Sequence, residues 1–224
     1  MSLRLVFDII FLLMAVIIFP LYIQYRRKYF KDRPLIKGPA KYVKTIIIAF
    51  TLLALLMLSW IVNERTFADL GLGYPDRNGL IGIGLAVALI LSLIGMMSFS
   101  SQPASLENKD REAKSVTDLM PKTRLETVVF IIFALIIGFA WEVLYRGALI
   151  YYFSQHIGVV FSALLAAMIY TIFHGAPSLV GYLQTFILAL LFLLLFILSG
   201  SLWGPIIIHT ALPLIMLIAH RRLT

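Results

Sequence analysis

The run LETVVFIIFALIIGFAWEVLYRGALIYY, Leu125–Tyr152, decides the fold class of this chain. It carries no charged residue between Glu126 and Glu142. A continuously apolar run of about 18 residues or more can cross roughly 30 Å of hydrocarbon as an α-helix. Because the run does not alternate between apolar and polar residues, it argues against the strands of a membrane barrel. It therefore predicts a transmembrane helix.

Similar apolar runs lie on both sides of this one. Hydrophobic residues make up 61% of the 224 residues, far more than a soluble domain needs. We expect about seven spans, at Leu5–Leu21, Thr45–Val62, Leu80–Phe99, Leu125–Tyr152, Val159–His174, Leu179–Leu198 and Leu202–Ala219. The predicted fold class is all-α, a polytopic transmembrane helical bundle, and its first expected partner is the lipid bilayer. The stretches Ala49–Leu58 and Leu188–Leu198 are almost purely aliphatic, and we expect them to face lipid.

Basic residues predict the orientation of the chain. The formal net charge is +8, and much of the excess lies in residues 25–44. The basic residues there are Arg26, Arg27, Lys28, Lys31, Arg33, Lys37, Lys41 and Lys44, against Asp32 alone. Short basic loops stay in the cytoplasm, and the chain also ends on the basic pair Arg221 and Arg222. We therefore expect a multi-pass cell-membrane protein with its N-terminus outside and its C-terminus cytoplasmic. Its compact length is typical of a prokaryotic protein, and its charge is a topology signal that predicts no nucleic-acid partner.

The distribution of polar residues divides the chain into two regions. Residues 1–124 form an N-terminal region of three spans, with the basic cytoplasmic loop 25–44 and a polar loop at 100–124. Residues 125–224 hold the ionisable groups that lie inside apolar spans. We expect the second region to be the functional core.

Four ionisable residues inside that core are candidates for function. Glu142 and Arg146 lie four residues apart, on one helical face. His174 closes one span and His209 lies inside another. Ionisable groups at membrane depth cost several kcal/mol unless they are paired or hydrated, so each is a functional hypothesis. The structural alternative is an ion pair that lets a helix end near the interface, with His174 as an interface residue.

A glutamate and two histidines from three helices allow two kinds of site. They can position and deprotonate a water, with neutral imidazole sharing the work of general base. They can also bind zinc as a two-His, one-Glu set. The H-E-x-x-H spacing of many zinc hydrolases is absent, so we expect no metal and no cofactor. The chain contains no cysteine, which excludes a thiolate metal site and a cysteine nucleophile.

Three motifs of the core resemble those of the CAAX-protease and bacteriocin-processing family, or Abi family, of intramembrane peptidases. The family's first motif is two adjacent glutamates, three variable residues and an arginine, usually followed by glycine. The segment from Glu142 through Arg146 to Gly147 fits it from the second glutamate onward. The second motif, an aromatic residue and a histidine separated by three positions, fits Tyr170 and His174. The third motif, a Trp-x-Pro block before a histidine, fits the segment Trp203–His209.

The resemblance implies a bundle of about eight helices around a conical cavity that opens to one side of the membrane. In that family a glutamate and a histidine activate a water, while another histidine and an asparagine stabilise the oxyanion. This chain would then be a glutamic-type endopeptidase that hydrolyses a peptide bond of a membrane-associated peptide or protein. The candidate catalytic residues are Glu142, His174 and His209, and the candidate supporting residues are Arg146, Tyr170 and Trp203.

Two positions depart from the family's motifs. Trp141 stands where the first glutamate is expected, and Pro213 stands where the asparagine is expected. Indole cannot accept a proton, and proline has no side-chain donor. Either Glu142 takes over as the base, or the chain is a catalytically silent relative that binds a membrane partner, as a regulator or an immunity-type protein. We favour the peptidase. A transporter ranks last, because two halves with paired discontinuous helices are not visible.

Overall fold

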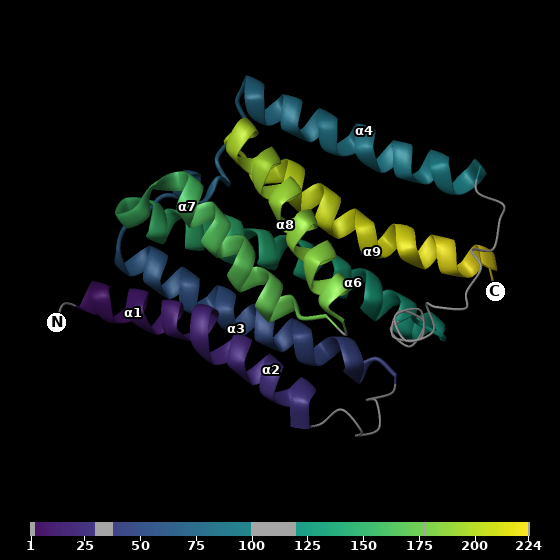
Figure 1. Cartoon of the computed structure of the whole chain (residues 1–224), viewed down its shortest axis with the longest axis horizontal. Coiled ribbons are helices and arrows are strands. Elements are labelled where there is room, and N and C mark those ends of the chain that lie inside the picture. Colours follow the sequence, from purple (N-terminus) through teal and green to yellow (C-terminus); the bar gives the residue numbers. More distant parts are fainter. Residues whose placement is uncertain (1–2, 30–37, 100–119, 177, 224) are drawn as a thin grey trace.

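The computed structural model describes residues 3–29, 38–99, 120–176 and 178–223 (Figure 1). These residues are helical and contain no strand, as the apolar runs predicted. The helices begin with α1 (Leu3–Leu12), the π-helix η1 (Leu13–Ile18), α2 (Phe19–Tyr29) and α3 (Ala40–Val62). They continue with the short 3₁₀ helix η2 (Phe67–Leu70), α4 (Arg77–Phe99), α6 (Arg124–Trp141), the π-helix η3 (Glu142–Ala148), α7 (Leu149–His174), α8 (Leu179–Ser199) and α9 (Trp203–Leu223).

Six stretches of the described residues are long and apolar enough to cross a membrane, by length and composition. The prediction of about seven spans is therefore close. The difference lies in residues 124–174, where the two central spans form one helical run of 51 residues. At 1.5 Å per residue this run is more than twice as long as the hydrocarbon core is thick. Gly158 breaks it with φ 74° and ψ 164°, a conformation that glycine adopts without strain, between the two expected spans.

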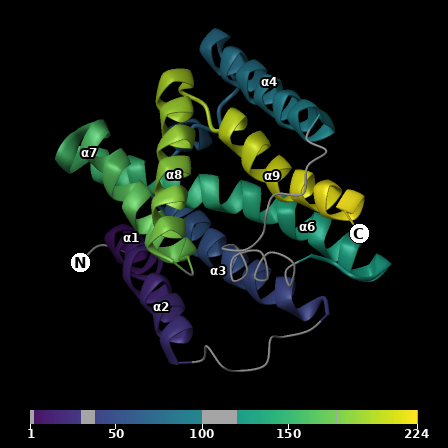
Figure 2. The same cartoon turned by 45° about the vertical axis from the view of Figure 1, so that its right-hand side comes forward.

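The helices pack side by side around a core centred on η3. In Figures 1 and 2, α4 lies at one edge of the molecule beside α9, and α1 and α2 lie at the opposite edge, with α1 beside α3. Between them, α6 packs against both α3 and α9, and α7 packs against α8. All residues of η3 are buried. The polar motif of the sequence therefore lies at the centre of the bundle.

Gly138 sets the distance between α6 and α9. A Cβ atom at this position would lie 2.1 Å from the Thr210 side-chain oxygen and 2.8 Å from the Thr210 backbone. Only a residue without a side chain permits so close an approach, a common use of glycine between membrane helices. This contact brings His209, the neighbour of Thr210, against the end of α6.

The aliphatic stretches of α3 and α8 do not face lipid alone, and this expectation was wrong. On α3, Leu52 and Leu56 are completely buried. On α8, Phe192 and Leu193 are buried as well. Each helix presents one stripe to the core and the rest to the outside. Lipid tails and the protein core are equally apolar, so both environments accept the same side chains.

The N-terminal region is held to the core by a polar cluster. Arg65 donates to both carboxylate oxygens of Asp8, at 2.8 and 2.6 Å, and Tyr152 on α7 donates to Asp8 at 2.7 Å. The guanidinium lies over the rings of Trp60, Tyr151 and Tyr152. Burial opposes its charge, but the hydrogen bonds with Asp8 hold the pKa of Arg65 above its ordinary value. The ion pair therefore links α1 and the end of α3 to α7.

The two expected loops of the N-terminal region are only partly described. Residues 25–29 and 40–44 belong to α2 and α3, so the helices extend into the predicted basic loop 25–44, while residues 30–37 lie outside the described part. Residues 100–119 of the predicted polar loop also lie outside it. The segment before α6 is fixed by Lys41, which donates to the Met120 carbonyl at 3.0 Å and lies 3.6 Å from Glu126.

Candidate functional site

The first motif is folded as a π-helix rather than as an α-helix. The segment η3 begins at Glu142, directly after Trp141, and includes Arg146. π-Helices have i→i+5 hydrogen bonds, are rare, and occur often at functional sites as single turns within α-helices. The turn begins where the sequence departs from the family's motif. It determines the directions in which Glu142 and Arg146 point.

The carboxylate of Glu142 joins two helices. It has no exposed surface, and its Oε1 accepts a hydrogen bond from Arg146 on the same turn, as the i,i+4 spacing predicted. The same oxygen lies 2.5 Å from Nδ1 of His209 on α9. The structure therefore brings together Glu142, Arg146 and His209, of which two are candidate catalytic residues.

Arg146 is held by rings on both sides. Its guanidinium lies 5.4 Å from the centre of the Tyr170 ring and 4.9 Å from that of Phe192. Aromatic faces attract a desolvated cation, so the charge is stabilised although the side chain is buried. Its Nη2 atom reaches the carbonyl of Ala189 at 3.4 Å, near the limit for a hydrogen bond. Arg146 thus neutralises Glu142 in an apolar environment.

The contact between Glu142 and His209 indicates which imidazole nitrogen faces the carboxylate as a donor. An ionised carboxylate can only accept hydrogen bonds. Nδ1 of His209 then donates to Glu142, and in the neutral tautomer with this donor the lone pair lies on Nε2. This assignment follows from the hydrogen-bond partners. Histidine in this arrangement can act as a general base, with the carboxylate orienting it and stabilising the imidazolium that forms.

The ring of Tyr170 lies between His174 and His209. His174 ends α7, its side chain is exposed, and its Nδ1 lies 3.1 Å from the carbonyl of Gly175. Its ring centre is 5.7 Å from that of Tyr170, whose ring centre is in turn 6.2 Å from that of His209. Tyr170 therefore contacts both imidazoles and the guanidinium of Arg146. That Glu142 and both histidines share one water stays a prediction.

The two departures from the family's motifs have structural consequences. Trp141 is buried, and its ring packs edge-on against Phe173 with centres 4.8 Å apart, beside the end of α7. Pro213 lies inside α9, four residues after His209. Because proline has no backbone N–H, the carbonyl of His209 lacks its usual helical partner. The replacement of asparagine therefore removes a side-chain donor and frees a backbone acceptor at the same point.

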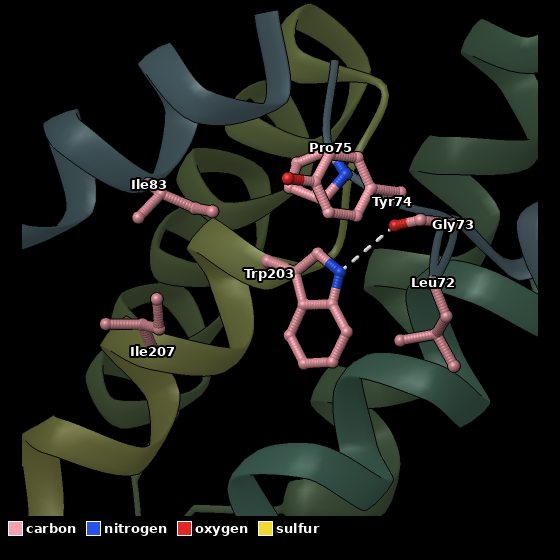
Figure 3. A pocket seen from close by; sticks show the side chains of 7 residues that line it. All are labelled: Leu72, Gly73, Tyr74, Pro75, Ile83, Trp203 and Ile207. Atoms are coloured by element: carbon pink, nitrogen blue, oxygen red, sulfur yellow. Dashed lines mark hydrogen bonds between the residues drawn. The ribbon is translucent and has the colours of Figure 1, made fainter. Parts of the chain in front are cut away.

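Trp203 supports α9 rather than the site directly. Its indole N–H donates to the carbonyl of Gly73 at 3.2 Å (Figure 3). The backbone N–H of Leu202 donates to the carbonyl of Gly71 at 2.9 Å. Trp203 and Ile207 line an open apolar groove of about 370 Å³ together with Leu72, Gly73, Tyr74, Pro75 and Ile83. His209 lies two residues beyond Ile207, about 200° around the helix. The groove therefore opens on the other side of α9.

Two residues of the site were not found from the sequence. Phe192 gave no signal, because it is one of several aromatic residues in an apolar helix. Tyr145 lies within the first motif and could have been noticed as a polar group inside a span. Its hydroxyl and the Oε2 atom of Glu142 are the two buried side-chain atoms without a hydrogen-bond partner among the described residues. Both belong to η3.

Comparison with known proteins identifies the core. A family model described as type II CAAX prenyl endopeptidase Rce1-like matches residues 123–215, which cover α6, η3, α7, α8 and part of α9. Over these residues the match agrees with the family that the three motifs predicted, and that family suggests a CAAX-type intramembrane protease fold for this part of the chain. No curated protein and no solved structure matches the chain.

Proposed function

We propose that this chain, a member of the Rce1-like family over residues 123–215, is an intramembrane endopeptidase. Its substrate would be a membrane-associated peptide or protein. One observation carries the proposal, the hydrogen bond between Glu142 on η3 and Nδ1 of His209 on α9. A buried carboxylate that orients an imidazole is the usual arrangement for a histidine base in hydrolases. A purely structural ion pair with Arg146 would not need the histidine.

In the proposed reaction, Nε2 of His209 takes a proton from water as the water oxygen bonds to the scissile carbonyl carbon. The electron pair of the carbonyl moves to its oxygen, which becomes an oxyanion. When the oxyanion collapses, the C–N bond breaks and the imidazolium returns its proton to the leaving amine. Glu142 stabilises the imidazolium, and Arg146 keeps Glu142 ionised. Such general acid–base catalysis contributes about 10²–10⁴-fold to the rate.

His174 is assigned to the substrate in this proposal. It is the exposed member of the three candidate residues, at the end of α7. A histidine there can donate a hydrogen bond to the substrate carbonyl and to the oxyanion that forms from it. The family's description names a prenyl endopeptidase, so a lipidated C-terminal peptide anchored in the membrane is the first substrate class to test.

The test is cleavage of a quenched peptide by the purified protein in lipid vesicles. A farnesylated peptide and the same peptide without the lipid are compared. We expect the parent to cleave, and His209→Ala to lose about 100-fold or more, as expected when a general base is removed. The matched control is His156→Ala, which removes an exposed histidine of α7 close to the break at Gly158. Equal rates for the two variants would show that His209 is not the base.

A second candidate function rests on Trp141. Its indole packs against Phe173 at the position where the family carries its first glutamate, so the core is complete without that acid. The chain would then be a catalytically silent relative that binds a membrane partner. In that case neither the parent nor Glu142→Gln cleaves any peptide, although both remain folded. The double variant Trp141→Glu, Pro213→Asn should then gain hydrolysis, because it restores both an acid and a side-chain donor.

A further inference from the structure

A small internal cavity lies beside the π-helix η3. It has a volume of about 10 Å³, which is the space that one water molecule needs. It lies between η3, α7 and α8, and its lining residues are Tyr145, Arg146, Ala166, Ala167, Tyr170, Ala189 and Leu193. Four of these residues are alanine or leucine, and the other three, Tyr145, Arg146 and Tyr170, carry polar groups. A cavity of this size is too small for any ligand larger than water. Whether it holds a water depends on the polar groups that line it.

Those polar groups have hydrogen-bonding capacity to spare. The side chain of Tyr145 is 1% exposed, and its hydroxyl has no partner among the described residues. Among the described residues, Nη2 of Arg146 makes one hydrogen bond, the 3.4 Å contact with the Ala189 carbonyl. Buried hydroxyls without a partner are rare because they lose their hydrogen bonds to water on folding. An internal water usually makes about three hydrogen bonds, and Tyr145, Arg146 and Ala189 all line the cavity.

We propose that one resident water occupies this cavity, bound by the Tyr145 hydroxyl, the Arg146 guanidinium and the Ala189 carbonyl. The water completes the hydrogen bonds of Arg146 on the side away from Glu142. It also ties η3 to α8, two elements that lack a strong direct polar bond at this point. Unlike the water of the proposed hydrolysis, it is a structural ligand of the fold, and its presence does not depend on whether the chain cleaves peptides.

The first test is thermal stability in detergent. If the water is bound, Tyr145→Phe removes a satisfied hydroxyl and lowers the melting temperature. The matched control is Tyr152→Phe. The hydroxyl of Tyr152 bonds to Asp8, Ser59 and Arg65, so its removal must also lower the melting temperature. A melting temperature of Tyr145→Phe that is unchanged or higher than that of the parent overturns the proposal, because removal of an unsatisfied hydroxyl costs nothing.

The second test fills the cavity. Ala166→Val adds two methyl groups to the lining and displaces the water, which leaves the Tyr145 hydroxyl unsatisfied. We expect the melting temperature to fall more in the parent than in the Tyr145→Phe background, because the two changes then act on the same water. Equal falls in both backgrounds contradict the proposal. A density map of the unmodified protein, at a resolution that shows waters, tests the proposal without any variant. A map with no peak between the three groups rejects the proposed water.

Discussion

Gly138→Ala tests how the close contact of α6 and α9 builds the site. The added Cβ would lie 2.8 Å from the backbone N and Cα of Thr210, where ordinary contact begins at 3.4 Å. A side chain can rotate away, but a helix backbone cannot, so the helices must separate. The 2.5 Å contact between His209 and Glu142 then lengthens to about 3 Å or more, because His209 precedes Thr210.

The expected cost has two parts. Overpacking of a tight core costs about 1–3 kcal/mol, and a weakened hydrogen bond to a charged group about 1.5–3 kcal/mol. The better helix propensity of alanine returns at most about 1 kcal/mol. The net loss of unfolding free energy is therefore about 1.5–5 kcal/mol. A displacement of about 1 Å in a catalytic geometry can cost about 100-fold in rate, so cleavage should fall by a similar factor.

The assay compares Gly138→Ala with Gly84→Ala in detergent. Gly84 lies on α4, and an added Cβ there would meet no atom within 4 Å, so this control should keep the stability and the activity of the parent. The second-site change Thr210→Ala removes the side-chain oxygen but not the backbone, so it should rescue Gly138→Ala only in part. If Gly138→Ala behaves like Gly84→Ala, the helices do not approach as closely as described, and this account of the site fails.

Three further predictions concern topology, the N-terminal cluster and metal. Single cysteines at Asp76 and Arg222 should react differently with an impermeant thiol reagent in intact cells. The cysteine at position 76 should be labelled and the cysteine at position 222 protected. Labelling of both would reject the predicted orientation. Asp8→Asn should lower the unfolding free energy by about 1.5–3 kcal/mol because the half-buried Arg65 loses its carboxylate partner. Arg4→Ala, in an exposed ion pair, should cost less than about 1 kcal/mol by thermal denaturation. Chelators should leave cleavage intact, and one equivalent of zinc lost together with activity would contradict the metal-free mechanism.

The sequence was sufficient for features that depend on local spacing and composition. Long apolar runs predicted the spans, and the i,i+4 spacing predicted the pair of Glu142 and Arg146. The order of the three motifs predicted the family, which the match over residues 123–215 confirmed. Each of these signals is contained within one helix, or in the order of segments along the chain.

The detailed contacts between helices were less predictable. The motifs predicted that Glu142 and His209 share one site, which their hydrogen bond confirms for this pair. The close approach of α9 to Gly138 was not predicted, because a glycine in an apolar run does not show which helix packs against it. The buried stripe of α8, with Ala189 and Phe192, was missed because apolar residues are equally suited to lipid and to the core. The π-helix gave no sequence signal, since each of its residues is also compatible with an ordinary α-helix.

The break at Gly158 has a consequence for the synthesis of this protein. The helices on either side of it form one apolar run of 51 residues, and the turn itself offers little more than Ser154, Gln155 and His156 as polar chain. A run this long with so short a polar turn is expected to enter the membrane as a pair of helices. The guanidinium of Arg146, before the break, lies 5.4 Å from the centre of the Tyr170 ring, after it. This contact stabilises a buried charge, and it forms only when the segments on both sides of Gly158 are in place.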